Sequence, residues 1–100
     1  MKPRFLDEAT VELDEAMFWY ERRREGLGGE FHDAVEDAIA EIVATPVKFA
    51  FYEGDRSTGK YRRFLLKRFP YFVVYEILPE ELLVVSISHS SRMPGYWRGR

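Results

Sequence analysis

The stretch "YFVVYEILPEELLVVSIS", residues 71–88, decides the fold of this chain. It holds two short runs rich in β-branched and aromatic residues, 71–77 and 82–88, which flank the turn sequence "LPEE". Such runs are typical of β-strands. A third run of the same kind, "YRRFLLKRF" at residues 61–69, precedes them across a single proline. The three runs therefore predict an antiparallel meander.

Side-chain alternation predicts which residues of the last run face the core. Leu83, Val85 and Ile87 share one face of a regular strand, and we expect that face to pack on helices. The same alternation places His89 at the edge of that face. A lone histidine in such a place is more often a hydrogen-bonded structural residue than an acid or base.

A helical hairpin is expected before the sheet. Asp7 is the expected cap of a helix over residues 8–24, because apolar side chains recur there at helical spacing. The glycine-rich residues 26–29 end this helix. A second amphipathic helix follows over residues 30–44 and stops before Pro46. The predicted fold class is α+β, with an N-terminal helical hairpin packed on a small, mainly antiparallel sheet.

The composition indicates one domain over residues 1–100. A chain of 100 residues with 46% hydrophobic and 16% aromatic content builds one core. It has no cysteine and only two histidines, so we expect no disulfide, no zinc site and no cofactor, and a reducing cytoplasm fits best. No apolar run approaches the roughly 20 residues of a membrane span, so no membrane partner is expected.

The charge is unevenly distributed along the chain. Residues 1–53 hold 13 acids and 6 bases, a net charge of −7, while residues 54–100 hold 4 acids and 9 bases, a net charge of +5. A dedicated nucleic-acid binder carries a strong basic excess, because phosphate contacts supply most of its sequence-independent affinity. The overall charge of −2 therefore indicates a local basic patch at most.

Two further features of the first helix and its surroundings bear on function. Phe18 and Trp19 lie off the apolar stripe of the helix. Either the segment after Pro46 covers them, or they form a groove for a partner helix, a common recognition mode with aromatic anchors. "GDRSTG", residues 54–59, predicts a mobile loop and lacks the spacing of a phosphate loop, so nucleotide binding is rejected.

The end of the chain, "SHSSRMPGYWRGR" at residues 88–100, is polar, aromatic and basic. The Pro-Gly pair favours a turn that folds Tyr96 and Trp97 back beside the last strand. Arg92 and Arg98 then flank the two rings with positive charge. We expect this end to be a working surface, because two such rings would cost solubility unless they are packed or used.

The order and spacing of four segments resemble the RelE/ParE superfamily of toxins from bacterial type II toxin-antitoxin systems, which includes plasmid stabilization proteins. The segments are "ELDEAMFWYE" (residues 12–21), "GLGGEF" (26–31), "RRFLLKRFPYFVVYE" (62–76) and "HSSRMPGYW" (89–97). The resemblance implies a cognate ParD-like antitoxin that wraps over the toxin and neutralises it. It also implies contact with operator DNA only indirectly, through the antitoxin.

This resemblance assigns two sets of binding residues. The expected antitoxin-binding residues are Phe18, Trp19, Arg23 and Phe51. The expected target-binding residues are Arg92, Tyr96, Trp97 and Arg98.

The resemblance leaves two activities open. ParE-like members act on DNA gyrase without cleaving RNA, whereas RelE-like members are endoribonucleases that cut messenger RNA on the ribosome. RNA cleavage needs proton donors, proton acceptors and cations near the phosphate. The residues expected to serve a nuclease are Arg63, His89, Arg92 and Tyr96, with Lys67 as an additional cation.

Three observations favour the ParE-like, non-enzymatic interpretation. The acidic first half would be repelled by ribosomal RNA, and the whole chain carries a net negative charge. Glu76 is also expected near Arg63 if the hairpin folds at Pro70, and a cross-strand pair would occupy that arginine. The RelE-like endoribonuclease is the alternative.

Overall fold

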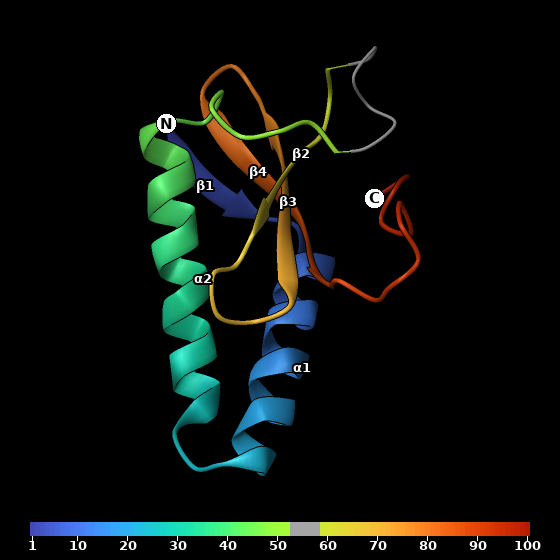
Figure 1. Cartoon of the computed structure of the whole chain (residues 1–100). Coiled ribbons are helices and arrows are strands. Elements are labelled where there is room, and N and C mark those ends of the chain that lie inside the picture. The colour runs from blue at the N-terminus through green and yellow to red at the C-terminus, as the bar shows by residue number, and fades with distance from the viewer. Residues whose placement is uncertain (53–58) are drawn as a thin grey trace.

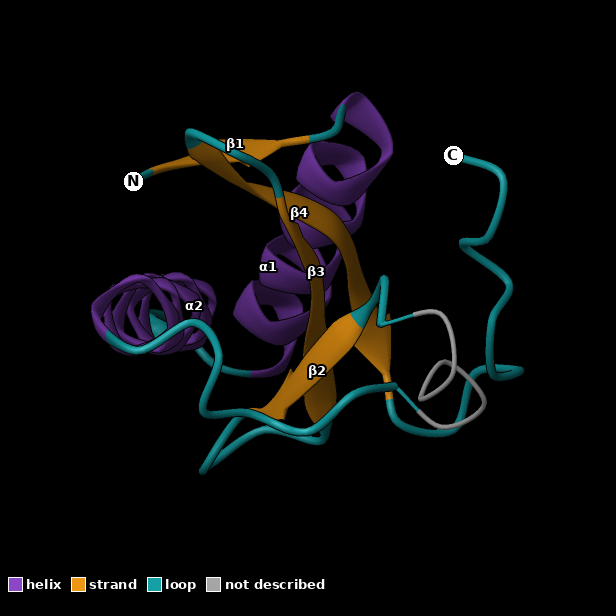
Figure 2. Ribbon diagram, turned by 90° about the horizontal axis from the view of Figure 1, so that it is seen from above, coloured by secondary structure: helices purple, strands orange, loops and turns teal. Residues whose placement is uncertain are grey.

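The computed structural model describes residues 1–52 and 59–100, so most of the predicted "GDRSTG" loop lies outside the described residues. Its elements in chain order are β1 (Lys2–Phe5), α1 (Asp7–Arg23), α2 (Leu27–Ala44), β2 (Arg62–Leu65), β3 (Tyr71–Ile77) and β4 (Glu81–His89). The sheet order is β1-β4-β3-β2, and the two helices form a hairpin against one face of the sheet (Figures 1 and 2). This arrangement confirms the predicted α+β fold class.

The strand pairing confirms the predicted meander and adds one strand. β2, β3 and β4 pair antiparallel in sequence order. β1 pairs parallel with the first half of β4, from Lys2 opposite Glu81 to Phe5 opposite Val84. β1 was not predicted, because Lys2–Phe5 has a single aromatic residue and no alternation of polar and apolar side chains. β1 pairs instead with a strand almost 80 residues away, and because this pairing is parallel the sheet is mixed.

A β-bulge in β4 overturns part of the predicted side-chain alternation. The register passes from Val74 opposite Ser86 to Tyr75 opposite Val84, so Val85 is an extra residue in β4. A bulge shifts the alternation of a strand by one residue. Before the bulge the even-numbered residues Leu82 and Val84 face the helices, whereas after it the odd-numbered Ile87 does.

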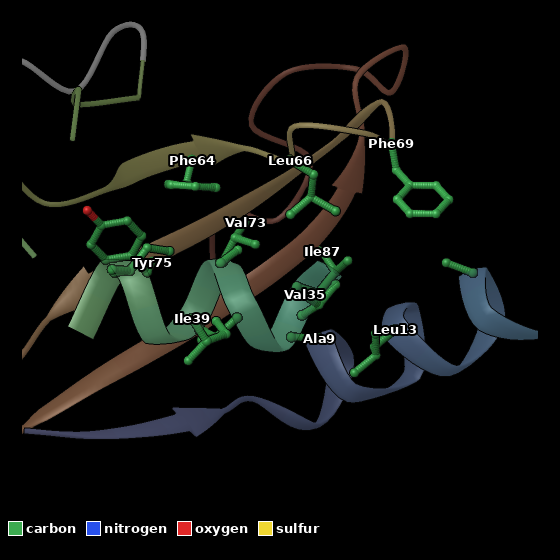
Figure 3. Packing of buried hydrophobic residues seen from close by; sticks show 14 of the residues in the cluster. Ala9, Leu13, Val35, Ile39, Phe64, Leu66, Phe69, Val73, Tyr75 and Ile87 are labelled. Atoms are coloured by element: carbon green, nitrogen blue, oxygen red, sulfur yellow. The ribbon is translucent and has the colours of Figure 1, made fainter. Parts of the chain in front are cut away.

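The predicted face was therefore wrong for two of three residues. Leu83 and Val85 pack with Trp97 on the sheet face away from the main core, whereas Ile87 packs in the main core as predicted. The main core lies between helices and sheet, where Val35 and Ile39 of α2 face the inner side of the sheet (Figure 3).

The helical hairpin is tighter than predicted. α2 begins at Leu27, three residues earlier than expected, directly after Gly26 with φ +87°. The Glu21 carboxylate accepts hydrogen bonds from the backbone N–H groups of Gly26 (2.9 Å) and Gly28 (3.0 Å), which satisfies donors at the start of α2. Asp7 is not the cap of α1: Leu6 holds that position without a side-chain hydrogen bond.

The hairpin closes around Gly28. A Cβ atom added at this position would lie 2.5 Å from the backbone oxygen of Met17 in α1, whereas one added at Gly29 would meet nothing within 4 Å. The close approach of the two helices therefore depends on the absence of a side chain at Gly28.

We predict that Gly28→Ala lowers the free energy of unfolding by about 1–3 kcal/mol, the usual cost of overpacking against an atom that cannot move. Gly29→Ala is the matched control, and it should be neutral or stabilise by up to about 1 kcal/mol because alanine favours helices. Urea unfolding followed by circular dichroism measures both. Equal stability of the two variants would contradict the packing described for Gly28.

Candidate functional site

The C-terminal tail, residues 90–100, packs on the outer face of the sheet. The Trp97 ring is 1% exposed and lies edge-on to Tyr52 (4.8 Å between ring centroids) and Tyr61 (4.7 Å), above Val74 and Val85. The tail is therefore not a frayed end. The predicted return of Trp97 to the last strand is confirmed, and of the two alternatives for its ring, packed or used, the structure shows it packed at the centre of a second small core.

Two arginines flank this second core. The Arg98 guanidinium lies 5.0 Å from the centroid of the Trp97 ring, and that of Arg63 lies 5.0 Å from the centroid of Phe72. The expected cross-strand pair between Arg63 and Glu76 does not form, since Arg63 lies opposite Val74 and its guanidinium rests on aromatic rings.

A half-buried carboxylate, Glu12 of α1, holds the tail in place. It accepts two hydrogen bonds from Arg100, at 2.8 and 3.0 Å, and one from the hydroxyl of Tyr96. It also accepts hydrogen bonds from the Ser86 hydroxyl (3.2 Å) and the Ile87 backbone N–H (3.1 Å). A single side chain thus joins α1, β4 and the tail.

This network replaces a missing strand. β1 ends opposite Val84, so among the described residues no strand lies beside the rest of β4 on that side. Glu12 takes the N–H of Ile87, and Arg100 donates a hydrogen bond to the carbonyl of Val85 at 3.1 Å. Backbone groups that would otherwise stay unpaired at the sheet edge are satisfied by an ion pair.

The network shifts the pKa values of its members in opposite directions. Burial alone would raise the pKa of Glu12, but hydrogen bonds from Arg100, Tyr96 and Ile87 outweigh it, and the net pKa is lowered. Burial, reinforced by the hydrogen bond to Glu12, raises the pKa of Tyr96. The Tyr96 hydroxyl is consequently held protonated and engaged as a donor.

A groove of about 590 Å³ runs between α1 and the end of the sheet. Its walls come from α1, the start of β3, the end of β4 and the tail. Trp19, His89, Arg92 and Tyr96 all line it. The structure therefore brings together four of the residues that the sequence singled out.

His89 is fixed within this groove by its neighbours. Its Nδ1 accepts hydrogen bonds from the backbone N–H of Ser91 (3.0 Å) and from the Ser91 hydroxyl (2.7 Å), so the neutral ring carries its proton on Nε2. The ring also lies edge-on to Tyr71, 5.1 Å between centroids.

The residues expected for a nuclease do not form one site. Arg63 lies beside Phe72 on the outer face of the sheet, whereas His89 packs against Tyr71 on the helix face. The Tyr96 hydroxyl is occupied by Glu12, and Lys67 lies 3.8 Å from Glu41 of α2. Only His89, Arg92 and Tyr96 share the groove.

The aromatic pair on α1 is open to solvent. Phe18 is 66% exposed and Trp19 is 49% exposed, so the alternative in which the segment after Pro46 covers them was wrong. The Arg23 guanidinium lies over the Trp19 ring at 4.1 Å, and that of Arg22 lies 5.9 Å from the centroid of Phe18. Each exposed ring therefore has a cation near its face, but Phe18 lines a shallow hollow beside Gly28 and Gly29, whereas Trp19 lines the groove beside the tail.

Phe51 does not belong to this surface. It forms an isolated bridge with Arg62, whose guanidinium lies 3.9 Å from the centroid of the Phe51 ring. The segment that carries Phe51 crosses the end of the molecule opposite the α1–α2 turn (Figure 1). The four residues expected to bind an antitoxin are therefore divided between two places.

Glu12 and Arg100, the two residues that position the tail, were not predicted from the sequence. They are separated by 88 residues, and their pairing has no local signal. His32, by contrast, pairs locally, since it lies 3.7 Å from Glu36 one turn along α2. Within residues 1–52 and 59–100 no cluster of three metal-ligating side chains occurs, and no helix there is long and apolar enough to cross a membrane.

The comparisons with known proteins agree with the fold. No protein-family model and no curated protein matches the chain. Solved structures do match, among them a chain of the structure described as "Chromosomal ParDE TA system from P. aeruginosa". That chain is 16% identical with a TM-score of 0.62, and the alignment covers 89% of this chain and 95% of that one. The chain therefore has a ParE-like fold, as the resemblance implied.

We predict that Glu12→Gln lowers the free energy of unfolding by about 2 kcal/mol at neutral pH, the size of hydrogen bonds to a charged group. Because the folded-state pKa of Glu12 lies below its ordinary value of 4.5, its contribution is present above that value and is lost as the pH falls below it. The stability difference between wild type and Glu12→Gln should therefore narrow on acidification.

Urea unfolding of both proteins between about pH 7 and pH 3 measures this narrowing. Glu15→Gln, which changes an exposed carboxylate on the same helix, is the control and should cost little at any pH. A gap between wild type and Glu12→Gln that stays constant across this range would contradict the role assigned to the Glu12 carboxylate.

Proposed function

We propose that this chain is the toxin of a type II toxin-antitoxin system, neutralised by a cognate ParD-like antitoxin in the cytoplasm. The observation that carries the proposal is the exposed pair of Phe18 and Trp19 on a chain with a ParE-like fold. Exposed aromatic patches mark protein interaction sites, and aromatic side chains are the usual anchors of helix-in-groove recognition.

The antitoxin contact is assigned to the surface that runs from α1 into the adjoining groove. Trp19 and Arg23 form its outer part, Trp19 also lines the groove, and Phe18 extends the proposed contact to the hollow beside Gly28. Phe51 remains a proposed second contact, which a long antitoxin segment reaches by wrapping around the molecule. Operator DNA is contacted through the antitoxin, since residues 1–53 of this chain carry a net charge of −7.

We infer a ParE-like action, in which the toxin binds a cellular target such as DNA gyrase and cleaves nothing. The separation of Arg63 from His89 on opposite faces of the sheet supports this inference. The proposed target-binding residues are Arg92, Tyr96 and Arg98 of the tail. Trp97 positions these three residues, because its buried ring fixes the tail on the sheet.

A RelE-like endoribonuclease that cuts messenger RNA on the ribosome is the second candidate. One observation favours it: His89, Arg92 and Tyr96 share one groove. In that case His89 would exchange protons through Nε2, and Arg92 would stabilise charge on the phosphate. The engagement of the Tyr96 hydroxyl by Glu12 counts against this candidate.

We predict that expression of this chain alone arrests bacterial growth and that an antitoxin encoded beside it restores growth. Purified toxin should inhibit supercoiling by DNA gyrase and leave messenger RNA intact in a translating extract with end-mapped message. Cuts aligned with codons would establish the ribonuclease instead. Normal growth with the intact protein accumulated to high level would exclude a toxin.

We predict that Trp19→Ala weakens the antitoxin complex by about 2 kcal/mol or more, roughly 30-fold in Kd, as expected of an aromatic anchor. The free toxin should lose little stability, because half of the ring is already exposed. Calorimetric titration measures the affinity, and Val47→Ala, which truncates another exposed apolar residue, is the control. Unchanged affinity of the folded Trp19→Ala variant would remove α1 from the interface.

A further inference from the structure

We propose that the outer edge of β2 accepts an extended segment of a protein partner by β-strand addition. The segment carries Lys or Arg at alternate positions that face Asp33 and Asp37 of α2. This inference uses neither the aromatic surface of α1 nor the tail, so it stands independently of the proposed function.

The first observation is an incomplete sheet edge. β2 is the last named strand of the sheet, and residues 50–52 cover only its first half, through Tyr52 N–H to Tyr61 O (2.8 Å) and Arg63 N–H to Ala50 O (3.0 Å). In an antiparallel strand successive residues point their backbone groups to opposite sides. Leu65, two residues after Arg63, therefore points its N–H and C=O outward, where no described residue bonds them.

The second observation is a groove beside this edge. It has a volume of about 410 Å³ and lies between α2 and the β2–β3 connection. Ala34 and Ala38 of α2 and the buried Phe64 and Leu66 form its apolar floor (Figure 3 shows the latter pair). A strand added at Leu65 would direct alternate side chains into this groove, because successive side chains point to opposite faces.

The third observation is the charge along the groove. Two ion pairs link α2 to the β2–β3 connection, Glu30 with Arg68 at 2.6 Å and Glu41 with Lys67 at 3.8 Å.

Asp33 and Asp37 lie on α2 between these two ion pairs and also line the groove. In the part of the chain that the structure describes, neither aspartate pairs with a lysine or arginine, and Asp33 has only His32 at 3.9 Å. The apolar groove is therefore bordered by uncompensated negative charge, which suits a basic side chain from a partner.

The side chains on the opposite face of the added strand would contact an apolar and a basic side chain of β2. Leu65 is 53% exposed, and Arg63 precedes it on the same outer face of the sheet. The segment that fits both faces alternates basic residues toward α2 with apolar or acidic residues toward Leu65 and Arg63. A second copy of β2 fits poorly, because antiparallel pairing centred on Leu65 would set Arg63 of one chain opposite Lys67 of the other.

The test uses the full chain and a probe peptide of alternating lysine and valine, acetylated and amidated at its ends. A peptide of the same composition with the lysines and valines in two blocks is the control. The alternating peptide should slow hydrogen exchange of the Leu65 amide and give contacts from its backbone to Leu65 in NMR spectra. The block peptide should do neither.

The variants separate the backbone contribution from the charge contribution. The double variant Asp33→Asn, Asp37→Asn should bind the alternating peptide about threefold or more weakly, the effect expected from the loss of two exposed ion pairs. Glu25→Gln, which removes one exposed acid from the α1–α2 turn, should leave the affinity unchanged within about 1.5-fold. Equal binding of both peptides, no protection of Leu65, or no effect of the aspartate changes would each overturn the proposal.

Discussion

The Glu12 carboxylate is the interaction on which the shape of the molecule depends. Glu12 lies on a turn of α1, and its carboxylate accepts hydrogen bonds from the part of β4 that lies beyond β1, from the Tyr96 hydroxyl and from the guanidinium of Arg100. Half-buried charges are tolerated where they are paired and hydrogen-bonded, and costly when one partner is lost. The same residue therefore fixes the sheet edge, the path of the tail and one wall of the groove, so these three features are not independent.

The elements that sequence predicted well are those with local patterns. The apolar stripe of α1 and the β-branched and aromatic runs of β3 and β4 can be recognised in the sequence, because each pattern repeats within one element. β1 and the bulge at Val85 were missed for a different reason. Both depend on pairing between segments far apart in the chain, and no local alternation of side chains can report it.

The same distinction divides the candidate site. Phe18 and Trp19 stood out because they break the pattern of their own helix, and they are exposed. Trp97 also stood out, but its type and position left open whether it is packed or used. Tyr52 and Tyr61 enclose the Trp97 ring, so the ring is packed, but no pattern in the sequence connects these two tyrosines with Trp97. Composition identifies unusual residues, while only the fold identifies their neighbours.

The parallel pairing of β1 with β4 has a consequence for biosynthesis. Lys2 pairs with Glu81, and Arg100 bonds Glu12 beside β4, so this side of the sheet is completed only when segments about 80 to 90 residues apart have met. Such long loops slow folding, because chain entropy is lost before the contacts form. On a translating ribosome the helical hairpin emerges before β4 and before the tail that packs on the outer face. Incomplete chains released before Glu81 would lack a central strand of the sheet and the only described partner of β1.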